Sequence, residues 1–168
     1  LKARIAYIPD ELYDFTSSSL LDMKKFYRGF YPTFDQTLFD KLAEAFPIDP
    51  KKPIRHLSKG MQKQAAFWLN LALQPDLLLL DEPTSGLDPV SRDELVELFR
   101  AIVADGQRSI LFSTHITTDL LDCADDITYI QKGHIVASKP MADFLADHPD
   151  CGSLEDIMVR LEKEDITL

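Results

Sequence analysis

Hydrophobic and polar positions follow two different periods in the first half of the chain. Residues 4–9 alternate between apolar and polar side chains, which predicts a short strand. Apolar residues then recur at helical spacing over residues 19–30 and 34–46, and a third helix of about sixteen residues is expected to begin at Ser58. We therefore predict one strand followed by a helical region over residues 13–75.

The pattern changes after Asp76. Residues 77–80 form a continuous apolar run, as is typical of a strand buried in a parallel sheet, and residues 108–115 are predicted to form another buried strand. Asp88 and Pro89 have the residue types of a helix N-cap and first helical position, so a helix is expected to run to about Val103. The remaining predictions are a helix over 116–123, a hairpin turning at 132–133, and helices over 141–146 and 153–164.

Strands and helices that alternate in this order predict an α/β fold with a parallel sheet. We divide the chain into four parts: a first core strand (1–12), a helical subdomain (13–75), an α/β core (76–140) and C-terminal helices (141–168).

Charge and cysteine content narrow the possible functions. The 168 residues contain 28 acidic residues against 18 Lys and Arg, for a net charge of -10. Phosphate backbones require a basic surface, so we expect no nucleic-acid partner and interpret the acidity as a solubilising surface. Cys123 and Cys151 form no CxxC pair and have no zinc-site spacing. The sequence contains no run of 18 apolar residues.

The apolar run that starts at Leu77 ends in two acids, Asp81 and Glu82. Ligands of open α/β sheets bind at the carboxyl ends of the strands, so these carboxylates stand where a ligand would lie. One carboxylate suits magnesium and the other suits orienting or deprotonating a water molecule. The alternative is a strand that runs into an ordinary acidic turn.

Four further positions are candidates for a chemical role, and structural interpretations compete with that role. Ser58 and Gly60 begin a helix whose free N–H groups could bind an anion, although Ser58 is also an ordinary N-cap. Asp88 caps the next helix. His115 ends the predicted strand over 108–115 and could hydrogen-bond a γ-phosphate, or could be a half-buried imidazole with a local partner.

The combination of motifs resembles the ATP-binding-cassette (ABC) ATPases. "LSKGMQ" resembles the family's signature motif, "LLLLDE" its Walker B strand, "SGLD" its D-loop and "STH" its switch-histidine segment, in family order. "RIAYIPD" resembles the strand leading into the Q-loop, and "SLEDIMVRL" the C-terminal helix of many bacterial exporter ATPases. The resemblance implies a P-loop NTPase-like (RecA-like) parallel sheet with an inserted helical subdomain.

The resemblance also implies roles in a site for ATP and Mg²⁺. Asp81 is expected to take part in magnesium binding, Glu82 to act as the catalytic base, and His115 to contact the γ-phosphate.

The remaining implied roles belong to a head-to-tail dimer. Ser58, Lys59 and Gly60 are expected to bind the γ-phosphate of a nucleotide held mainly by the other subunit, and Asp88 is expected to couple the two sites.

Four features depart from the family pattern. Lys59 replaces the first signature glycine, Met61 replaces the usual glutamine, and Asp10 stands where the Q-loop glutamine is expected to contact the metal. The pattern GxxxxGK[ST] is missing, because no glycine is followed by lysine. We therefore expect the N-terminal strands that carry the phosphate-binding loop to lie outside this sequence. A sheet edge would then be exposed beside the strand over 108–115. We also expect the 168 residues to be inactive on their own.

The leading hypothesis is the C-terminal part of the nucleotide-binding subunit of an ABC exporter, bound peripherally to the cytoplasmic face of the cell membrane through a transmembrane permease subunit. Its other partner is a second nucleotide-binding subunit. One alternative is a non-catalytic regulatory or interaction module that has lost ATP binding. Another is an α/β domain with accidental motifs.

Overall fold

The computed structural model describes residues 4–11 and 16–164, so the expected start of the helical region at residue 13 lies outside the described residues. The chain divides into two compact units, Leu1–Thr114 and His115–Leu168. Within them the elements are β1 (Ile5–Ile8), α1 (Leu20–Phe30), α2 (Gln36–Ala45), the 3₁₀ helix η2 (Ile54–His56), α3 (Lys59–Leu71), β2 (Leu77–Asp81), α4 (Pro89–Val103), β3 (Ser109–Ser113), α5 (Thr117–Cys123), β4 (Asp126–Gln131), β5 (His134–Pro140), α6 (Met141–Ala146) and α7 (Leu154–Glu164).

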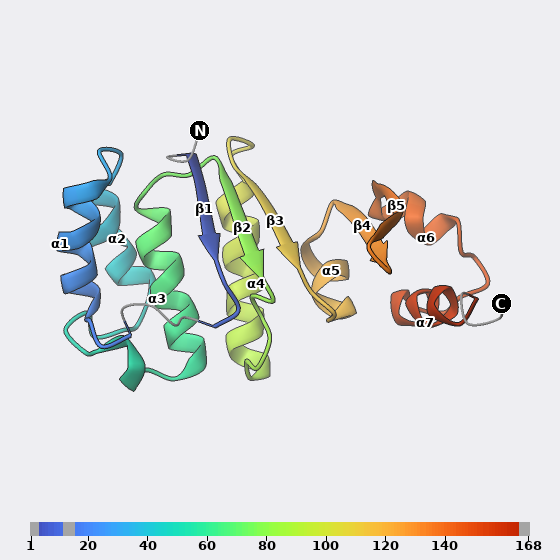
Figure 1. Ribbon diagram of the computed structural model, residues 1–168, viewed down its shortest axis with the longest axis horizontal. Helices are drawn as coiled ribbons and strands as arrows, with labels where there is room; N and C mark the ends of the chain where they lie inside the picture. Colours follow the sequence, from blue (N-terminus) through green and yellow to red (C-terminus); the bar gives the residue numbers. More distant parts are fainter. Residues whose placement is uncertain (1–3, 12–15, 165–168) are drawn as a thin grey trace. The chain divides into compact units, whose positions relative to one another are not determined.

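A parallel sheet forms the centre of the first unit. Its strands lie in the order β1-β2-β3, with Ile8 beside Leu80 and Leu80 beside Phe112 (Figure 1). Side chains alternate between the two faces of a strand, so one face of the sheet carries buried residues such as Ile8 and Leu80. The opposite face carries Tyr7 and Leu111, which are 58% and 62% exposed.

Helices α3 and α4 cover the buried face of the sheet. Phe67 of α3 packs on Phe99 of α4, with ring centroids 5.6 Å apart, and Phe99 packs on Phe112 of β3 at 5.8 Å. Phe67 and Phe99 are almost fully buried, and burial of apolar area of this size is a main source of folding free energy. This aromatic chain joins the helical region to the sheet.

The helical region has its own core around Trp68 of α3. The Trp68 ring lies 5.0 Å from the ring of Phe39 and 6.0 Å from that of Phe46, and its indole N–H donates to the Phe39 carbonyl at 2.7 Å. Ser19 begins α1 with a capping box that it shares with Asp22. The helices are therefore fixed both by local caps and by aromatic packing.

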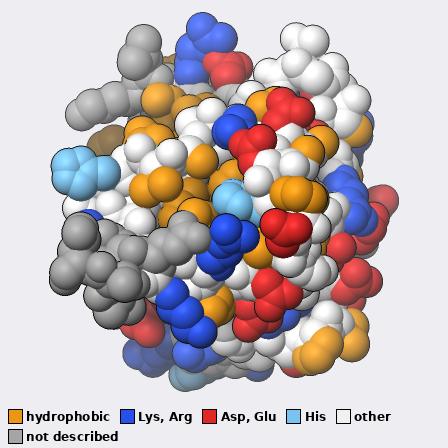
Figure 2. Space-filling view, turned by 90° about the vertical axis from the view of Figure 1, so that its right-hand side faces the viewer, with side chains coloured by type: hydrophobic (Ala, Val, Ile, Leu, Met, Phe, Trp, Pro, Cys, Tyr) orange, Lys and Arg blue, Asp and Glu red, His pale blue; other side chains and the backbone are white. Residues whose placement is uncertain are grey.

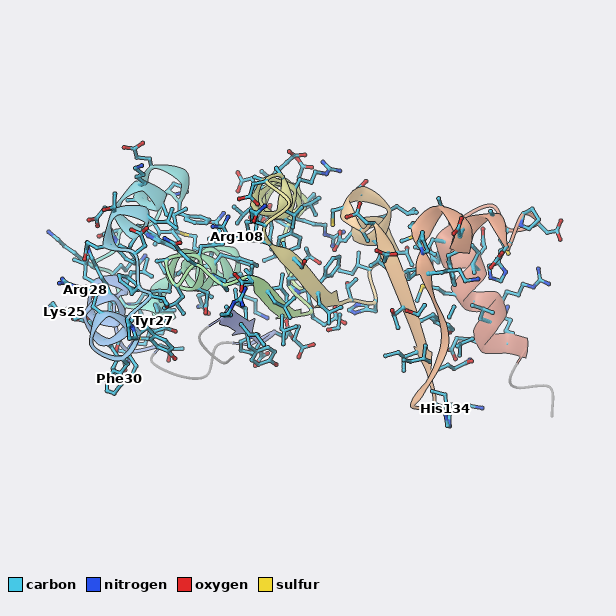
Figure 3. All side chains as sticks on the ribbon, turned by 90° about the horizontal axis from the view of Figure 1, so that it is seen from above. Lys25, Tyr27, Arg28, Phe30, Arg108 and His134 are labelled. Carbon is cyan, nitrogen blue, oxygen red and sulfur yellow. The ribbon has the colours of Figure 1, made fainter. Side chains whose placement is uncertain are left out.

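The second unit is a hairpin packed with short helices. Its core consists of Ile127, Tyr129, Met141, Phe144, Leu154 and Ile157, all buried. Strands β4 and β5 are antiparallel and turn at Lys132 and Gly133, whose φ angles of 47° and 80° suit a two-residue hairpin loop. His134 lies beside the tip of this hairpin (Figure 3).

Most elements predicted from the sequence are confirmed, with one local correction. The strand predicted over 108–115 ends at Ser113, so His115 lies past the strand rather than at its end. On α2, Phe39 is buried because it packs on Trp68. On α1, Phe26 is 40% exposed and does not join the core.

Acidic and basic side chains are interspersed on the face shown in Figure 2. In the described part of the chain, we find no helix with both the length and the hydrophobicity required to cross a bilayer.

Candidate functional site

Two acidic residues stand where β2 ends. Asp81 is exposed, and its carboxylate accepts a hydrogen bond from the Ser113 hydroxyl at 2.7 Å. The parallel register places Asp81 beside Ser113, so the ends of β2 and β3 present their polar groups together. The carboxylate of Asp81 is thus oriented by a neighbouring strand while it stays accessible to solvent.

Glu82 follows Asp81 in an unusual backbone conformation. Its φ angle is 44°, in the left-handed region that a residue with a side chain seldom adopts. The Glu82 N–H donates to the Ser113 carbonyl at 3.0 Å, and the Glu82 carbonyl accepts from the N–H of Ser85 at 3.1 Å. These bonds fix the turn between β2 and the following segment, and strain of this kind tends to occur at functional sites.

A buried lysine of α3 reaches the same turn. The Lys63 ammonium donates to the Glu82 carbonyl at 2.6 Å and to the Asp10 carboxylate at 3.1 Å. The Lys63 side chain is 8% exposed, whereas that of Asp10 is 42% exposed. The structure thus brings Asp10 and Glu82 together through a residue that the sequence reasoning missed.

The sequence did contain a signal for Lys63. It precedes Ala66 and Phe67 by three and four residues, and residues at that spacing share one face of a helix. Both are buried, so a lysine in line with them had to find a partner inside the unit.

The start of α3 is accessible. Ser58 is the N-cap of the helix, and its side chain accepts from the Met61 N–H at 3.2 Å. Ser58 and Lys59 are both exposed. The capping interpretation of Ser58 is therefore confirmed, and the helix start remains open to a ligand from outside.

The start of α3 lies against the first turn of α4 and the segment that precedes it. A Cβ atom added to Gly60 would lie 3.2 Å from the Ser91 hydroxyl oxygen, which is tighter than ordinary contacts. Gly86 has a φ angle of 70°, and a Cβ atom added to it would lie 3.8 Å from the Lys59 ammonium nitrogen. Two segments that are 26 residues apart (60 to 86) thus form one continuous surface, which we call the signature surface: Ser58, Lys59, Gly60, Gly86 and Asp88.

Asp88 is the N-cap of α4 and completes this surface. Its carboxylate accepts from the Ser91 hydroxyl at 2.7 Å and from the backbone N–H groups of Val90 and Ser91 at 3.1 Å. The Ser91 hydroxyl, followed by the Ser91 backbone N–H, lowers the pKa of Asp88 below its ordinary value because both stabilise the ionised form.

We expect the Ser91→Ala variant to have a higher Asp88 pKa than the parent. The lowered pKa means that the cap stabilises the fold above the ordinary carboxyl pKa and loses that contribution as pH falls through the folded-state value. NMR titration of the Asp88 carboxyl carbon measures the shift. Ser109→Ala on β3 serves as the control, and an unchanged Asp88 pKa in Ser91→Ala would contradict the assignment.

The predicted histidine belongs to the second unit. His115 is its first residue, and the part it plays beside Glu82 stays a prediction.

The described residues include no group of three or more His, Cys, Asp or Glu side chains arranged as a metal site. Mg²⁺ bound with a nucleotide needs few protein ligands, because phosphates and water complete its coordination. The exposed carboxylate of Asp81 fits that requirement, whereas the Asp10 carboxylate is already bound by an ammonium group.

Known proteins resemble this chain in sequence and in fold. A family model described as "AAA domain, putative AbiEii toxin, Type IV TA system" matches residues 23–122, more than half of the chain. The chain is 35% identical over 138 residues to the ABC transporter ATP-binding protein YtrB of Bacillus subtilis (strain 168), covering 80% of this chain and 46% of that protein. The chain belongs to the ABC ATPases. The expectation drawn from its motifs is therefore confirmed at the level of family and fold.

Two other matches extend the comparison of this ABC ATPase. It is 41% identical over 87 residues to the energy-coupling factor transporter ATP-binding protein EcfA2 of Lactococcus lactis subsp. cremoris (strain MG1363), covering 52% of this chain and 30% of that protein. The solved structure of an ATP-binding subunit of an ABC transporter matches with a TM-score of 0.82 and 25% identity, over 96% of this chain and 69% of the other. This ABC ATPase spans less than half the length of both curated relatives.

Proposed function

We propose that this chain is the C-terminal part of a nucleotide-binding subunit that couples binding and hydrolysis of ATP to export across a membrane. The single observation that carries the proposal is the tip of β2, where Asp81 is accessible and Glu82 is held in a strained turn beside it. Export is favoured over import by the resemblance of residues 153–161 to the C-terminal helix of exporter ATPases.

The residues of this chain divide the work at the nucleotide. Glu82 orients the attacking water and accepts its proton, and Asp81 holds Mg²⁺ directly or through water. The bound metal neutralises charge on the phosphates. The ammonium of Lys63 would repel a metal ion at the Asp10 carboxylate, so Asp81 rather than Asp10 is the main metal-side group. His115 contacts the γ-phosphate.

The signature surface serves the nucleotide of the other subunit. Its helix start offers backbone N–H groups and a positive dipole end, and Lys59 adds a positive charge beside them. Because Gly60 lies in close contact with Ser91, the surface cannot accept a side chain at that position without displacement. A head-to-tail dimer brings this surface of one subunit to the strand tips of the other.

The phosphate-binding loop must come from a further segment of polypeptide, because these 168 residues contain no GxxxxGK[ST] pattern. Strand β3 forms one edge of the sheet among the described residues, and its free backbone groups can pair with a strand of that segment. Turnover must therefore be measured on the complete nucleotide-binding subunit, and we expect the 168 residues alone to be inactive.

A transmembrane permease subunit is the proposed membrane partner. It holds the ATPase at the cytoplasmic face of the membrane, and the helical region with the segment at Asp10 docks against it. Closure of the nucleotide-binding dimer then moves the permease, as in other closure-driven switches.

We expect Ser58→Arg to block ATP-driven dimer closure in the complete subunit while the ATP affinity of the single subunit stays nearly unchanged. The bulky cation would occupy the helix start that receives the partner's γ-phosphate. Light scattering measures closure, and equilibrium binding of a labelled ATP analogue measures affinity.

Ser153→Arg is the matched control for loss of a cap. Ser153 accepts from the N–H of Asp156 at 3.1 Å at the start of α7, much as Ser58 accepts from Met61. Each substitution loses a capping bond that is typically worth about 1 kcal/mol. Equal closure by Ser58→Arg and the parent would count against the shared-site model.

The second candidate is a non-catalytic regulatory module that keeps the fold without ATP chemistry. The missing phosphate-binding loop favours it, whereas the ordered carboxylate of Asp81 favours the enzyme. Finding GxxxxGK[ST] in the polypeptide that contains this chain would decide for the enzyme.

A further inference from the structure

Lys63 is a charged group in a position where charge is costly. Its side chain is 8% exposed and lies on the core face of α3, one turn before the fully buried Phe67. An ammonium removed from water needs close compensating partners. The compensation is asymmetric, because the shorter contact, 2.6 Å, goes to the neutral carbonyl of Glu82 and the longer, 3.1 Å, to the Asp10 carboxylate.

The shorter contact acts on the strained residue of the site. Glu82 has a φ angle of 44°, and its carbonyl direction is set by two donors, the Lys63 ammonium and the Ser85 N–H. A charge-assisted hydrogen bond is about twice as strong as a neutral one, so Lys63 is the stronger of the two. Without it, the left-handed conformation of Glu82 loses a main support.

Lys63 also stands close to the signature surface. It lies on α3, five positions after the N-cap Ser58, and a helix of 13 residues moves as one body over that distance. A displacement of the helix start therefore reaches the Glu82 carbonyl through a single side chain.

We infer that Lys63 is a positioning residue that ties the signature helix to the catalytic glutamate of its own chain, with Asp10 as its counterion. In a head-to-tail dimer the signature surface binds the nucleotide of one site, while Glu82 acts at the other site. Lys63 is thus a direct physical connection between the two sites, and this inference rests on the proposed function.

The test is Lys63→Met in the complete subunit, with the exposed Lys41→Met of α2 as the matched control. Methionine keeps the buried apolar stem and removes the ammonium, and Asp10 remains partly hydrated, so the thermal midpoint should fall little. We expect kcat to fall about tenfold or more while KM for ATP stays within about twofold, as when a group acts on the transition state rather than on binding.

Three further readouts separate positioning from general damage. The Glu82 N–H, bound to Ser113 in the parent, should exchange faster with solvent in Lys63→Met. Lys63→Met should add little to the loss already caused by Glu82→Gln, because both changes act through one group. Lys63→Arg, which keeps the charge and donors, should recover much of kcat.

The outcomes distinguish failure of the inference about Lys63 from failure of the proposed function. Parental kcat together with unchanged Glu82 exchange in Lys63→Met would overturn the inference, as would equal losses in Lys63→Met and Lys63→Arg. If Lys63→Met does not fold, Lys63→Gln replaces it under the same criteria. A complete subunit that does not hydrolyse ATP at all would refute the proposed function instead, and the exchange of Glu82 would still test its link to Lys63.

Discussion

The Glu82→Gln variant of the complete subunit is expected to lose ATP turnover by about 10²- to 10⁴-fold while it still dimerises with ATP. Glutamine has nearly the same shape as glutamate but cannot accept the proton of the attacking water. The backbone bonds that hold the turn, from the Glu82 N–H to Ser113 and from Lys63 to the Glu82 carbonyl, do not depend on the side chain. Steady-state phosphate release measures the loss, and light scattering with ATP measures dimerisation.

Glu97→Gln is the control for loss of one carboxylate. Glu97 lies on the exposed side of α4, where it pairs with Arg100, and exposed pairs of this kind contribute little. The Glu97→Gln variant should hydrolyse ATP at the parental rate. Hydrolysis at the parental rate by Glu82→Gln would show that Glu82 is not the base.

The Trp68→Ala variant is expected to lose about 3–5 kcal/mol of folding free energy. Trp68 is 1% exposed, packs between Phe39 and Phe46, and donates to the Phe39 carbonyl. Alanine leaves a cavity in its place and removes the indole donor to the Phe39 carbonyl. Urea unfolding of this variant is followed by far-UV circular dichroism. Trp68 is the single tryptophan, so the variant has no tryptophan fluorescence to follow.

Phe30→Ala tests whether the effect of Trp68 comes from burial rather than from the loss of any aromatic ring. Phe30 is 69% exposed at the end of α1 and points away from the helices (Figure 3). Its contact with Phe26 is a surface contact, with centroids 4.5 Å apart. The Phe30→Ala substitution should lower the free energy of unfolding by less than about 1 kcal/mol. Equal destabilisation by the two variants would refute the proposed core.

The fold follows from the sequence mainly where patterns are local. The apolar run before Asp81 and the turn at Lys132–Gly133 predicted β2 and the β4–β5 hairpin, because strand burial and positive φ angles have direct signatures in residue type. Asp88 and Pro89 likewise predicted the start of α4. His115 was placed at the end of a strand that in fact ends two residues earlier, since element boundaries have weaker signals than element types.

The sequence by itself determined the family, the α/β order of elements and the positions of Asp81, Glu82 and the signature turn. Each of these features is specified by a short contiguous segment. The tertiary structure alone decided that Lys63 reaches both Asp10 and the Glu82 carbonyl, and that Gly60 lies against Ser91. These contacts join residues 19 to 53 positions apart. Such distances are closed by packing of helices on a sheet, and no local pattern of residue types encodes them.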